Sequence, residues 1–350
     1  MIGIRADGND KIGIGHIMRC LTIAEELKKR EEEIVFFLAD SSCRNIIEER
    51  GYRCRVLATV YECMEEELPI LLELLEEISI NTLLIDSYFV TTYYLDKVRE
   101  KVVCIYLDDM NSFIYPVDLI INYNIYAKAK DYPYALEWIA DSVERNKKTK
   151  VLTGIKYAPV RKEFLENRKL ISAEVKDIMI SLGGSDIYNL STKIAIRLLR
   201  TTDCNIHVVC GPFNIYREEL KKLAQTEERV IMHENVKEMW LLMKQCDLAV
   251  SAAGSTMCEL AVAGIPTVTF SYVENQRRIA EGFSVQMAAL SAGHYEKKNE
   301  VVFLEDIEKL VGSMIDCFEL REEVITNAAV AVDGYGAGRI ADAILLFNAN

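Results

Sequence analysis

A histidine stands near the start of the chain in a setting that suits acid–base chemistry. The segment KIGIGHIMR, residues 11–19, places His16 directly behind Gly13 and Gly15 and three residues ahead of Arg19. The glycines allow a tight turn and the close approach of a ligand. A predicted helix starts at His16, and the partial positive charge of a helix N-terminus disfavours imidazolium. We therefore expect a neutral His16 that can accept a proton near pH 7.

Aspartates stand at the ends of three predicted strands in the first half of the chain. Asp7 follows the first strand, Asp86 closes the segment NTLLID, and Asp108 and Asp109 close VVCIYLDD. In a parallel sheet the carboxyl ends of the strands share one edge, where ligands bind. Carboxylates there could orient His16, stabilise a cationic transition state or bind a metal, although strand-end aspartates also commonly cap turns. We predict that Asp7 and Asp86 act in catalysis and that Asp108 contacts the substrate.

The same residues argue against a metal ion or a nicotinamide cofactor. Asp108 and Asp109 are adjacent, and neighbouring residues of a strand point to opposite faces, so the two carboxylates seldom share an ion. A dinucleotide fingerprint requires a third glycine, but none follows Gly13 and Gly15 at the required spacing. We therefore predict no metal requirement and no cofactor.

Short apolar runs alternate with longer amphipathic stretches, which is the β-α-β rhythm of a parallel sheet. In the first half of the chain, the runs predict strands at residues 1–6, 33–40, 52–57, 81–86, 102–109 and 118–122. Helical patterns lie between most of them, for example at residues 16–29 and 67–78. In the first of these helices, the apolar residues that recur at helical spacing and should face the sheet are Ile17, Leu21, Ala24 and Leu27.

A charged stretch, residues 160–176, interrupts this rhythm and marks a domain boundary. The second series of predicted strands covers residues 177–184, 205–211, 229–233, 247–254 and 266–270. We predict a first domain over residues 1–168, a second over residues 175–335, and a helix in residues 336–350 that could pack back on the first domain. The predicted architecture is two doubly wound α/β domains with a cleft between them.

Two glycine-rich turns follow strands of the second domain and precede helices. Successive backbone N–H groups in such turns form a phosphate cradle. The turn residues that we predict to bind a diphosphate are Gly183, Gly184, Ser185, Gly254, Ser255 and Thr256. Glu259 follows in the first turn of the second helix, where its carboxylate can accept both hydroxyls of a ribose. Asn275 and Gln276 open another helix and could reach sugar hydroxyls, although Asn275 is also a plausible helix cap.

The bulk composition limits the class of protein. The 350 residues are 50% hydrophobic and 27% charged, which suits a globular protein of two domains. A net charge of −13 disfavours a nucleic-acid partner. The ten cysteines are scattered without a CxxC pair, which favours reduced thiols. We recognise no signal peptide and no apolar run of about 20 residues, and we expect a cytoplasmic monomer without membrane insertion.

Several of these segments together resemble one enzyme family. They are residues 4–27 with the GIGH turn, GIKYAPVRKEF at residues 154–164, SLGGSD at residues 181–186, and residues 251–276 with GSTMCE and ENQ. In this order they are similar to the UDP-sugar hydrolase of pseudaminic acid biosynthesis, whose relatives are described as spore-coat polysaccharide biosynthesis proteins. The last segment is shared with the wider GT-B superfamily, which includes the lipid II N-acetylglucosaminyltransferase.

The resemblance implies a GT-B fold and a reaction. The reaction is hydrolysis of UDP-2,4-diacetamido-2,4,6-trideoxy-β-L-altropyranose to UDP and the free sugar, in the biosynthesis of a surface glycan such as that of glycosylated flagellin. The family's proposed base, the histidine of the GxGH turn, is His16 here. By the same similarity Glu259 binds the ribose, the ENQ segment at residues 274–276 faces the sugar, and the backbone near Val236 meets the uracil.

One position departs from the family pattern. Where the family tends to read Asp-His-Tyr, this chain has Asp86, Ser87 and Tyr88. The difference bears on the identity of the sugar more than on the reaction. The remaining residues that we predict to contact the substrate are Gly13, Gly15, Arg19 and Tyr88.

Two alternatives to a hydrolase fit the same pattern. A GT-B glycosyltransferase would use the same UDP-sugar donor with a sugar acceptor in place of water. A non-catalytic nucleotide-sugar binding protein of a glycan assembly complex would need the nucleotide site but not His16 with its strand-end carboxylates. Release of UDP from a UDP-sugar without an acceptor separates these three hypotheses.

Overall fold

The computed structural model describes residues 1–9, 11–137 and 148–348 of the chain. The chain divides into two compact units: unit 1 comprises Met1–Pro159 together with Tyr335–Asn350, and unit 2 comprises Val160–Gly334. The sequence pattern extends the first domain to residue 168, whereas the structure assigns residues 160–168 to unit 2. The reason is local packing, because the short helix α5 (Lys162–Glu166) lies against α9 (Thr256–Ala263).

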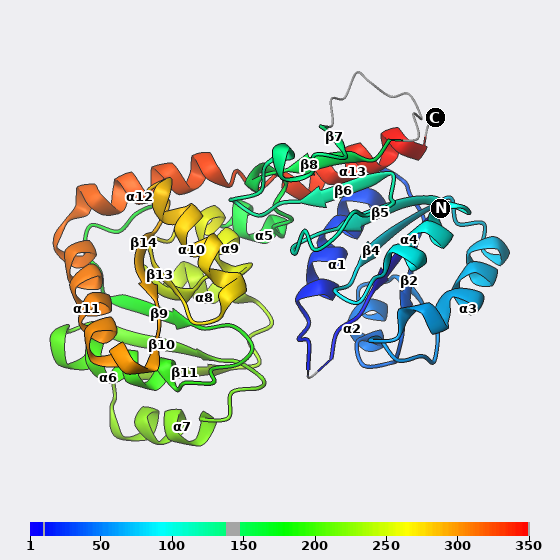
Figure 1. The fold of residues 1–350 in the computed structure, drawn as a ribbon. Helices are drawn as coiled ribbons and strands as arrows, with labels where there is room; N and C mark the ends of the chain where they lie inside the picture. The colour runs from blue at the N-terminus through cyan, green and yellow to red at the C-terminus, as the bar shows by residue number, and fades with distance from the viewer. Residues whose placement is uncertain (10, 138–147, 349–350) are drawn as a thin grey trace. The chain divides into compact units, whose positions relative to one another are not determined.

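Unit 1 is built on an eight-stranded sheet in which all paired strands are parallel (Figure 1). Its strands are β1 (Ile2–Ala6), β2 (Ile34–Leu38), β3 (Arg53–Val56), β4 (Thr82–Asp86), β5 (Val103–Leu107), β6 (Leu119–Asn122), β7 (Leu136–Glu137) and β8 (Lys150–Thr153). The order across the sheet is β3-β2-β1-β4-β5-β6-β8-β7. The two strands that the sequence pattern does not predict, β7 and β8, are short and extend the β6 edge.

Helices cover both faces of this sheet. The helices of unit 1 are α1 (Gly15–Lys28), α2 (Arg44–Glu48), α3 (Met64–Glu77), α4 (Thr92–Arg99), α13 (Gly336–Asn348) and the 3-10 turns η1 (Ala129–Asp131) and η2 (Ile155–Tyr157). Successive side chains of a strand point to opposite faces. On β2, Phe36 therefore joins the core shared with α1 and α13, while Val35 and Phe37 join the core shared with α3 and α4. Unit 1 is thus doubly wound, as the sequence predicts.

The first helix buries the face that its sequence predicts. Ile17, Leu21, Ala24 and Leu27 are all fully buried in one apolar cluster. Ile340 and Ile344 of α13 belong to the same cluster, so the segment at the end of the chain packs on α1 within unit 1. Gly336 begins α13 against the backbone of Ala158, and a Cβ at this glycine would lie 2.2 Å from that carbonyl oxygen.

Unit 2 contains a six-stranded parallel sheet in the order β11-β10-β9-β12-β13-β14. Its strands are β9 (Asp177–Ser181), β10 (Asn205–Cys210), β11 (Val230–Glu234), β12 (Leu248–Ala252), β13 (Thr267–Ser271) and β14 (Leu290–His294). Its helices, besides α5 and α9, are α6 (Leu190–Thr201), α7 (Arg217–Thr226), α8 (Met239–Gln245), α10 (Glu274–Val285), η3 (Lys297–Asn299), α11 (Glu300–Asp316) and α12 (Phe318–Ala331). Within the residues that the structure describes, no helix combines the length and apolar character of a membrane span.

Strand register brings the ends of β1 and β4 together. The two strands are neighbours, and Ala6, the last residue of β1, pairs with Asp86, the last residue of β4. After β1 the chain turns into α1, which packs on one face of the sheet. The N-terminus of α1 therefore lies at the carboxyl edge of the sheet, where open α/β sheets bind ligands.

Candidate active site

His16 and Asp86 form a buried pair at this edge of unit 1. His16 is the second residue of α1, and its Nδ1 lies 2.6 Å from Oδ1 of Asp86. Both side chains are almost fully buried. The convergence of these two residues, predicted from strand ends and helix position, is present in the structure.

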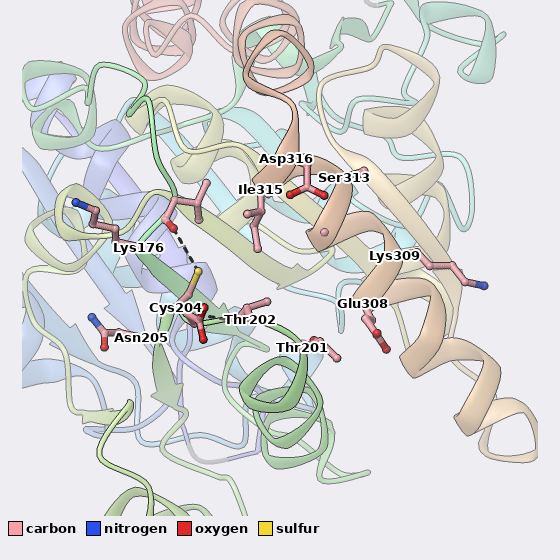
Figure 2. Close-up of a pocket in the computed structure, with 13 residues that line it drawn as sticks. Lys176, Thr201, Thr202, Cys204, Asn205, Glu308, Lys309, Ser313, Ile315 and Asp316 are labelled. Atoms are coloured by element: carbon pink, nitrogen blue, oxygen red, sulfur yellow. Dashed lines mark hydrogen bonds between the residues drawn. The ribbon is translucent and has the colours of Figure 1, made fainter.

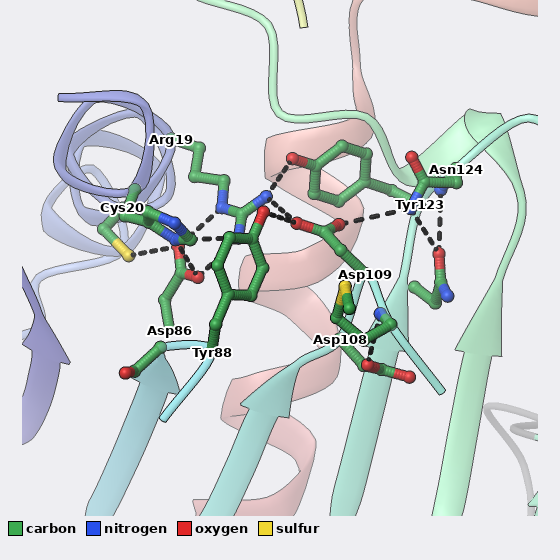
Figure 3. Close-up of polar contacts among 12 residues, drawn as sticks. Arg19, Cys20, Asp86, Tyr88, Asp108, Asp109, Tyr123 and Asn124 are labelled. Atoms are coloured by element: carbon green, nitrogen blue, oxygen red, sulfur yellow. Dashed lines mark hydrogen bonds and ion pairs between the residues drawn. The ribbon is translucent and has the colours of Figure 1, made fainter. Parts of the chain in front are cut away.

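Arg19 binds the same carboxylate from the next turn of α1 (Figure 3). Its Nε lies 2.5 Å from Oδ2 of Asp86, and its Nη2 lies 2.5 Å from Oδ1. Its Nη1 also donates to Asp109 and to the hydroxyl of Tyr123, each at 2.7 Å. The guanidinium is therefore occupied by two carboxylates, and we expect Arg19 to organise the site rather than to bind a phosphate of the substrate.

The charges in this cluster are fixed by their neighbours. Burial alone raises the pKa of Asp86, but Arg19 and His16 outweigh burial and hold the pKa well below its ordinary value. Burial alone lowers the pKa of Arg19, but the charges of Asp109 and Asp86 raise it well above its ordinary value. Asp86 therefore stays a carboxylate and does not take a proton from His16 near neutral pH.

The contacts of His16 define its tautomer. Nη2 of Arg19 lies 3.0 Å from Nδ1, but arginine has only donors, and the carboxylate of Asp86 is closer. We assign the Nδ1 proton to the hydrogen bond with Asp86, an assignment that follows from the network. Nε2 then carries the free lone pair, which is the form that accepts a proton.

Tyr88 and Asp109 complete the cluster. The Tyr88 ring meets the His16 ring edge to face, with 4.6 Å between ring centroids, and its hydroxyl donates to Asp109 at 3.1 Å. Asn124 donates to the other oxygen of Asp109 at 3.2 Å. Burial, followed by the charge of Asp109, raises the pKa of Tyr88 above its ordinary value, so the phenol stays protonated. Figure 3 shows Tyr88, Asp109 and Arg19 facing one another above the strand ends.

Asp108, for which a substrate contact is predicted, does not join this cluster. Its side chain accepts hydrogen bonds from the hydroxyls of Tyr115 at 3.0 Å and Tyr132 at 2.5 Å. The backbone N–H groups of Met110 and Asn111 also donate to it, at 2.8 and 2.9 Å. Both oxygens are thus used to hold the turn after β5. The sequence does carry a signal that Asp109 faces α1, because Asp109 lies two residues after Leu107, which packs in the cluster with α1.

Asp7 lies beside the site but is held by a separate network. It accepts hydrogen bonds from Arg5 at 2.5 Å and from the backbone N–H of Ala39 at 2.8 Å. Nε and Nη2 of Arg5 in turn donate to Glu67 of α3, each at 2.7 Å. Asp7 also lines a small cavity together with Ile12, His16, Asp86, Ser87, Tyr88 and Phe89. Its carboxylate therefore contributes charge near His16 without contacting the imidazole.

The glycines ahead of His16 shape the loop that enters α1. Gly13 has a φ of +74° and exchanges backbone hydrogen bonds with Asn9, at 2.9 and 3.2 Å. Gly15 is the first residue of α1, and no Cβ contact would arise at either glycine. A side chain at either position would therefore meet open space rather than other atoms of the protein.

The first glycine-rich turn of unit 2 is tightly packed and its helix is already capped. Gly183 has a φ of +84°, and a Cβ at Gly211 would lie 2.2 Å from the Gly183 carbonyl oxygen. The buried carboxylate of Asp186 accepts the N–H groups of Leu190 and Ser191 at the start of α6, both at 2.8 Å. An internal anion thus occupies this helix N-terminus, which leaves Gly184 and Ser185 of the turn itself as the predicted phosphate contacts.

The second glycine-rich turn leaves its helix open. In the described part of the chain, the first turn of α9 carries no side-chain cap from Ser255. Gly254 and Thr256 are partly exposed, and Ser255 is exposed. A helix N-terminus with free N–H groups attracts an anion. Glu259 lies on the same helix, partly buried, with Oε1 3.0 Å from Nη2 of Arg161.

The other predicted unit 2 residues lie at the ends of β11 and β13. Val236 follows β11, is partly exposed and comes directly after Asn235, which has a φ of +51°. Gln276 accepts a hydrogen bond from the Tyr272 backbone at 3.2 Å. Asn275 is exposed and is the second residue of α10, so it is not the helix cap that its position also allows.

A cavity of unit 2 is lined by none of the predicted site residues (Figure 2). It stands at the amino ends of β9 and β10 of unit 2, beside the last turns of α6 and α11. Its lining mixes Lys176 and Lys309 with Asp203, Glu308 and Asp316. Among the residues placed by the structure, no group of three or more histidine, cysteine, aspartate or glutamate side chains is arranged to hold a metal ion.

Three relatives share sequence with most of the chain. The uncharacterized protein MJ1062 of Methanocaldococcus jannaschii is 30% identical over 319 residues, which are 87% of this chain and 62% of that protein. The spore coat polysaccharide biosynthesis protein SpsG of Bacillus subtilis is 25% identical over 97% of this chain and 96% of its own length. The UDP-2,4-diacetamido-2,4,6-trideoxy-beta-L-altropyranose hydrolase of Campylobacter jejuni is 29% identical over 79% of this chain and 93% of its own length. The chain is thus similar to these three proteins over most of its length.

Two further comparisons bear on this chain. A family model described as a protein of unknown function, DUF354, matches residues 155–311. Among solved structures, MurG of Acinetobacter baumannii has a TM-score of 0.64 at 13% identity, over 98% of this chain and 99% of that chain. A UDP-glucosyltransferase of Polygonum tinctorium has a TM-score of 0.70 at 12% identity, over 100% and 99%. These neighbours confirm the predicted GT-B fold, and at such identities they show the fold alone.

Proposed function

We propose that the chain hydrolyses a UDP-linked sugar at the anomeric carbon, with inversion, releasing UDP and the free sugar. The observation that carries the proposal is the buried pair of His16 and Asp86, which leaves Nε2 of the histidine as a free base. The name of the Campylobacter jejuni relative supports UDP-2,4-diacetamido-2,4,6-trideoxy-β-L-altropyranose as the first substrate to test. The name of SpsG supports a place in surface-polysaccharide biosynthesis.

The chemical step uses His16 as the general base. Nε2 takes a proton from water while the water oxygen attacks the anomeric carbon from the face opposite the leaving group. The bond from that carbon to the β-phosphate oxygen breaks, and its electron pair leaves with UDP. The imidazolium that forms is stabilised by the adjacent carboxylate of Asp86, which already holds the Nδ1 proton.

The charge of the unit 1 cluster suits the sugar rather than the diphosphate. Asp86 and Asp109 together neutralise Arg19 and leave one carboxylate in excess. Positive charge develops on the sugar ring as the anomeric bond breaks, and nearby carboxylates stabilise it. We propose that the UDP part binds the N-terminus of α9 in unit 2, where no side chain caps the helix and its partial positive charge receives the negative charge of the diphosphate.

Replacement of Glu259 by alanine tests the nucleotide assignment. We propose that its carboxylate accepts the ribose hydroxyls through charge-assisted hydrogen bonds, each worth roughly 1.5–3 kcal/mol. The affinity for UDP, measured by calorimetry, should fall at least about tenfold. Circular dichroism and thermal unfolding should show that the fold is retained. Unchanged UDP affinity in a folded Glu259→Ala variant would remove Glu259 from the site.

Hydrolysis in water enriched in heavy oxygen tests the reaction itself. Attack at carbon places the label on the free sugar, and the released UDP stays unlabelled. The sugar should first appear in the inverted configuration by proton nuclear magnetic resonance. Label in the UDP would mean attack at phosphorus and would contradict the proposal. UDP release only after addition of a sugar acceptor would favour a glycosyltransferase, and no release at all would favour a binding protein.

A further inference from the structure

The segment GIKYAPVRKEF contains an arginine that the reaction as proposed does not use. Arg161 stands just before α5, and Glu259 lies in the first turn of α9, 98 residues later in the sequence. Nη2 of Arg161 donates to Oε1 of Glu259 at 3.0 Å, and both side chains are partly buried. The contact lies wholly within unit 2, in which α5 packs on α9.

Arg161 is itself fixed by a second contact. Its guanidinium carbon lies 4.8 Å from the centre of the Phe164 ring, and Phe164 is buried one turn along the chain in α5. A guanidinium over an aromatic face is attracted by the ring and stacks on it. The arginine is thus held between a buried ring and the carboxylate, unlike the flexible ion pairs of a protein surface, which contribute little.

The contact with Arg161 affects both the pKa of Glu259 and the hydrogen bonding of its two oxygens. Burial raises the pKa of Glu259, and the charge and hydrogen bond of Arg161 oppose this rise without cancelling it. Among the residues that the structure describes, Oε2 has no hydrogen-bond partner, whereas Oε1 is taken by Arg161. One oxygen of the carboxylate is therefore open, and its ionisation depends on the arginine.

We propose that Arg161 is a positioning residue for nucleotide recognition, which fixes Glu259 so that its open oxygen receives the hydroxyls of a ribose. This inference rests on the proposed function, in which Glu259 is the ribose ligand. Hydrogen bonds to an ionised acceptor are about twice as strong as those to a neutral one. The pair should therefore set the preference for a ribonucleotide over its 2′-deoxy analogue, a property that contacts to the phosphates do not affect.

Calorimetric titration of the full chain with UDP and with 2′-deoxy-UDP tests this role. In the Arg161→Met variant, the UDP affinity should fall about tenfold, which corresponds to one charge-assisted hydrogen bond. The affinity for 2′-deoxy-UDP should change much less, so the ratio of the two affinities should collapse toward one. Arg161→Lys should recover part of the ratio, because it restores the charge without the planar fork.

The pH dependence gives a second readout. Without Arg161, burial acts alone on Glu259, so the carboxyl should hold its proton up to a higher pH. The UDP affinity of Arg161→Met should rise with pH as Glu259 loses its proton, and the rise should be centred at a higher pH than in the wild type. The affinity for 2′-deoxy-UDP should follow pH less steeply.

Controls separate this inference from the proposed function. Arg168→Met removes a cation near the other end of α9, where Arg168 donates to the Val262 carbonyl at 3.5 Å, and it should leave both affinities unchanged. If Arg161→Met weakens both nucleotides equally, or leaves the ratio intact, the positioning role is wrong. If Glu259→Gln also leaves the ratio intact, Glu259 is not the ribose ligand and the proposed nucleotide site fails as well. Thermal unfolding of each variant identifies any general loss of fold.

Discussion

Replacement of His16 by asparagine is expected to lower the turnover of UDP-sugar about 10²–10⁴-fold, which is the usual contribution of a general base. Asparagine is polar and close in size, and its amide can still bond to Asp86, but it cannot take a proton from water. UDP binding should be nearly unchanged, because we assign the nucleotide to unit 2. The measurements are UDP release at saturating substrate and calorimetric UDP affinity.

A second histidine offers a matched control for this prediction. His207 of β10 also pairs with an aspartate, with Nε2 2.9 Å from Oδ1 of Asp177, but it belongs to unit 2 and not to the α1 cluster. His207→Asn should retain turnover. A His16→Asn variant that hydrolyses the substrate at close to the wild-type rate would show that His16 is not the base.

Replacement of Arg5 by methionine is expected to destabilise the protein by about 3–5 kcal/mol, as removal of one partner of a buried ion pair does. Arg5 and Glu67 are fully buried, and Arg5 also binds Asp7. The variant would leave two carboxylates in the core without their cation. Burial alone lowers the pKa of Arg5, but Glu67 and Asp7 raise it above its ordinary value, so the arginine is charged throughout the usual pH range. Urea denaturation measures the change.

An exposed ion pair provides the comparison for Arg5. Arg44 and Glu48 pair across one turn of α2, and both side chains are largely in solvent. Arg44→Met should leave the free energy of unfolding nearly unchanged, because water replaces the lost contact. Equal urea midpoints for Arg5→Met and Arg44→Met would contradict the structural role of the buried network.

The sequence predicts those parts of the molecule that depend on local periodicity. The helical spacing of Ile17, Leu21, Ala24 and Leu27 identifies the buried face of α1, and all four are fully buried. The alternation of apolar runs and amphipathic stretches predicts most strands of both parallel sheets but misses β7, β8 and β14. The pairing of His16 with Asp86 also follows, because one begins a helix and the other ends a strand at the same edge of a sheet.

Which of the strand-end aspartates point toward α1 depends on the alternation of side chains along each strand. Their position at the strand ends does not by itself predict this. Leu84 and Leu107 face α1, so Asp86 and Asp109, two residues later in each case, also point toward α1. Asp7 and Asp108 have the opposite parity. Asp7, after β1, binds Arg5. Asp108, after β5, binds the hydroxyls of Tyr115 and Tyr132.

Contacts between distant segments are beyond the reach of spacing rules. Arg5 and Glu67 are 62 residues apart, and Arg161 and Glu259 are 98 residues apart. Each pair forms because a helix packs on a neighbouring element, and nothing in either local sequence specifies the partner. The domain boundary falls early for the same reason, since the packing of α5 on α9 decides the unit to which residues 160–168 belong.

The packing of α13 on α1 has a consequence for the order in which the chain is completed. Unit 2 is a continuous segment, whereas unit 1 is assembled from residues on both sides of it. On the ribosome, α1 emerges long before α13, whose Ile340 and Ile344 belong to the same apolar cluster in the finished core. A nascent chain that ends at residue 159 would lack α13, so the part of α1 that packs on α13 would be open to water and to any chaperone that binds apolar surfaces. Unit 1 is therefore the last to close, after unit 2 has been synthesised in full.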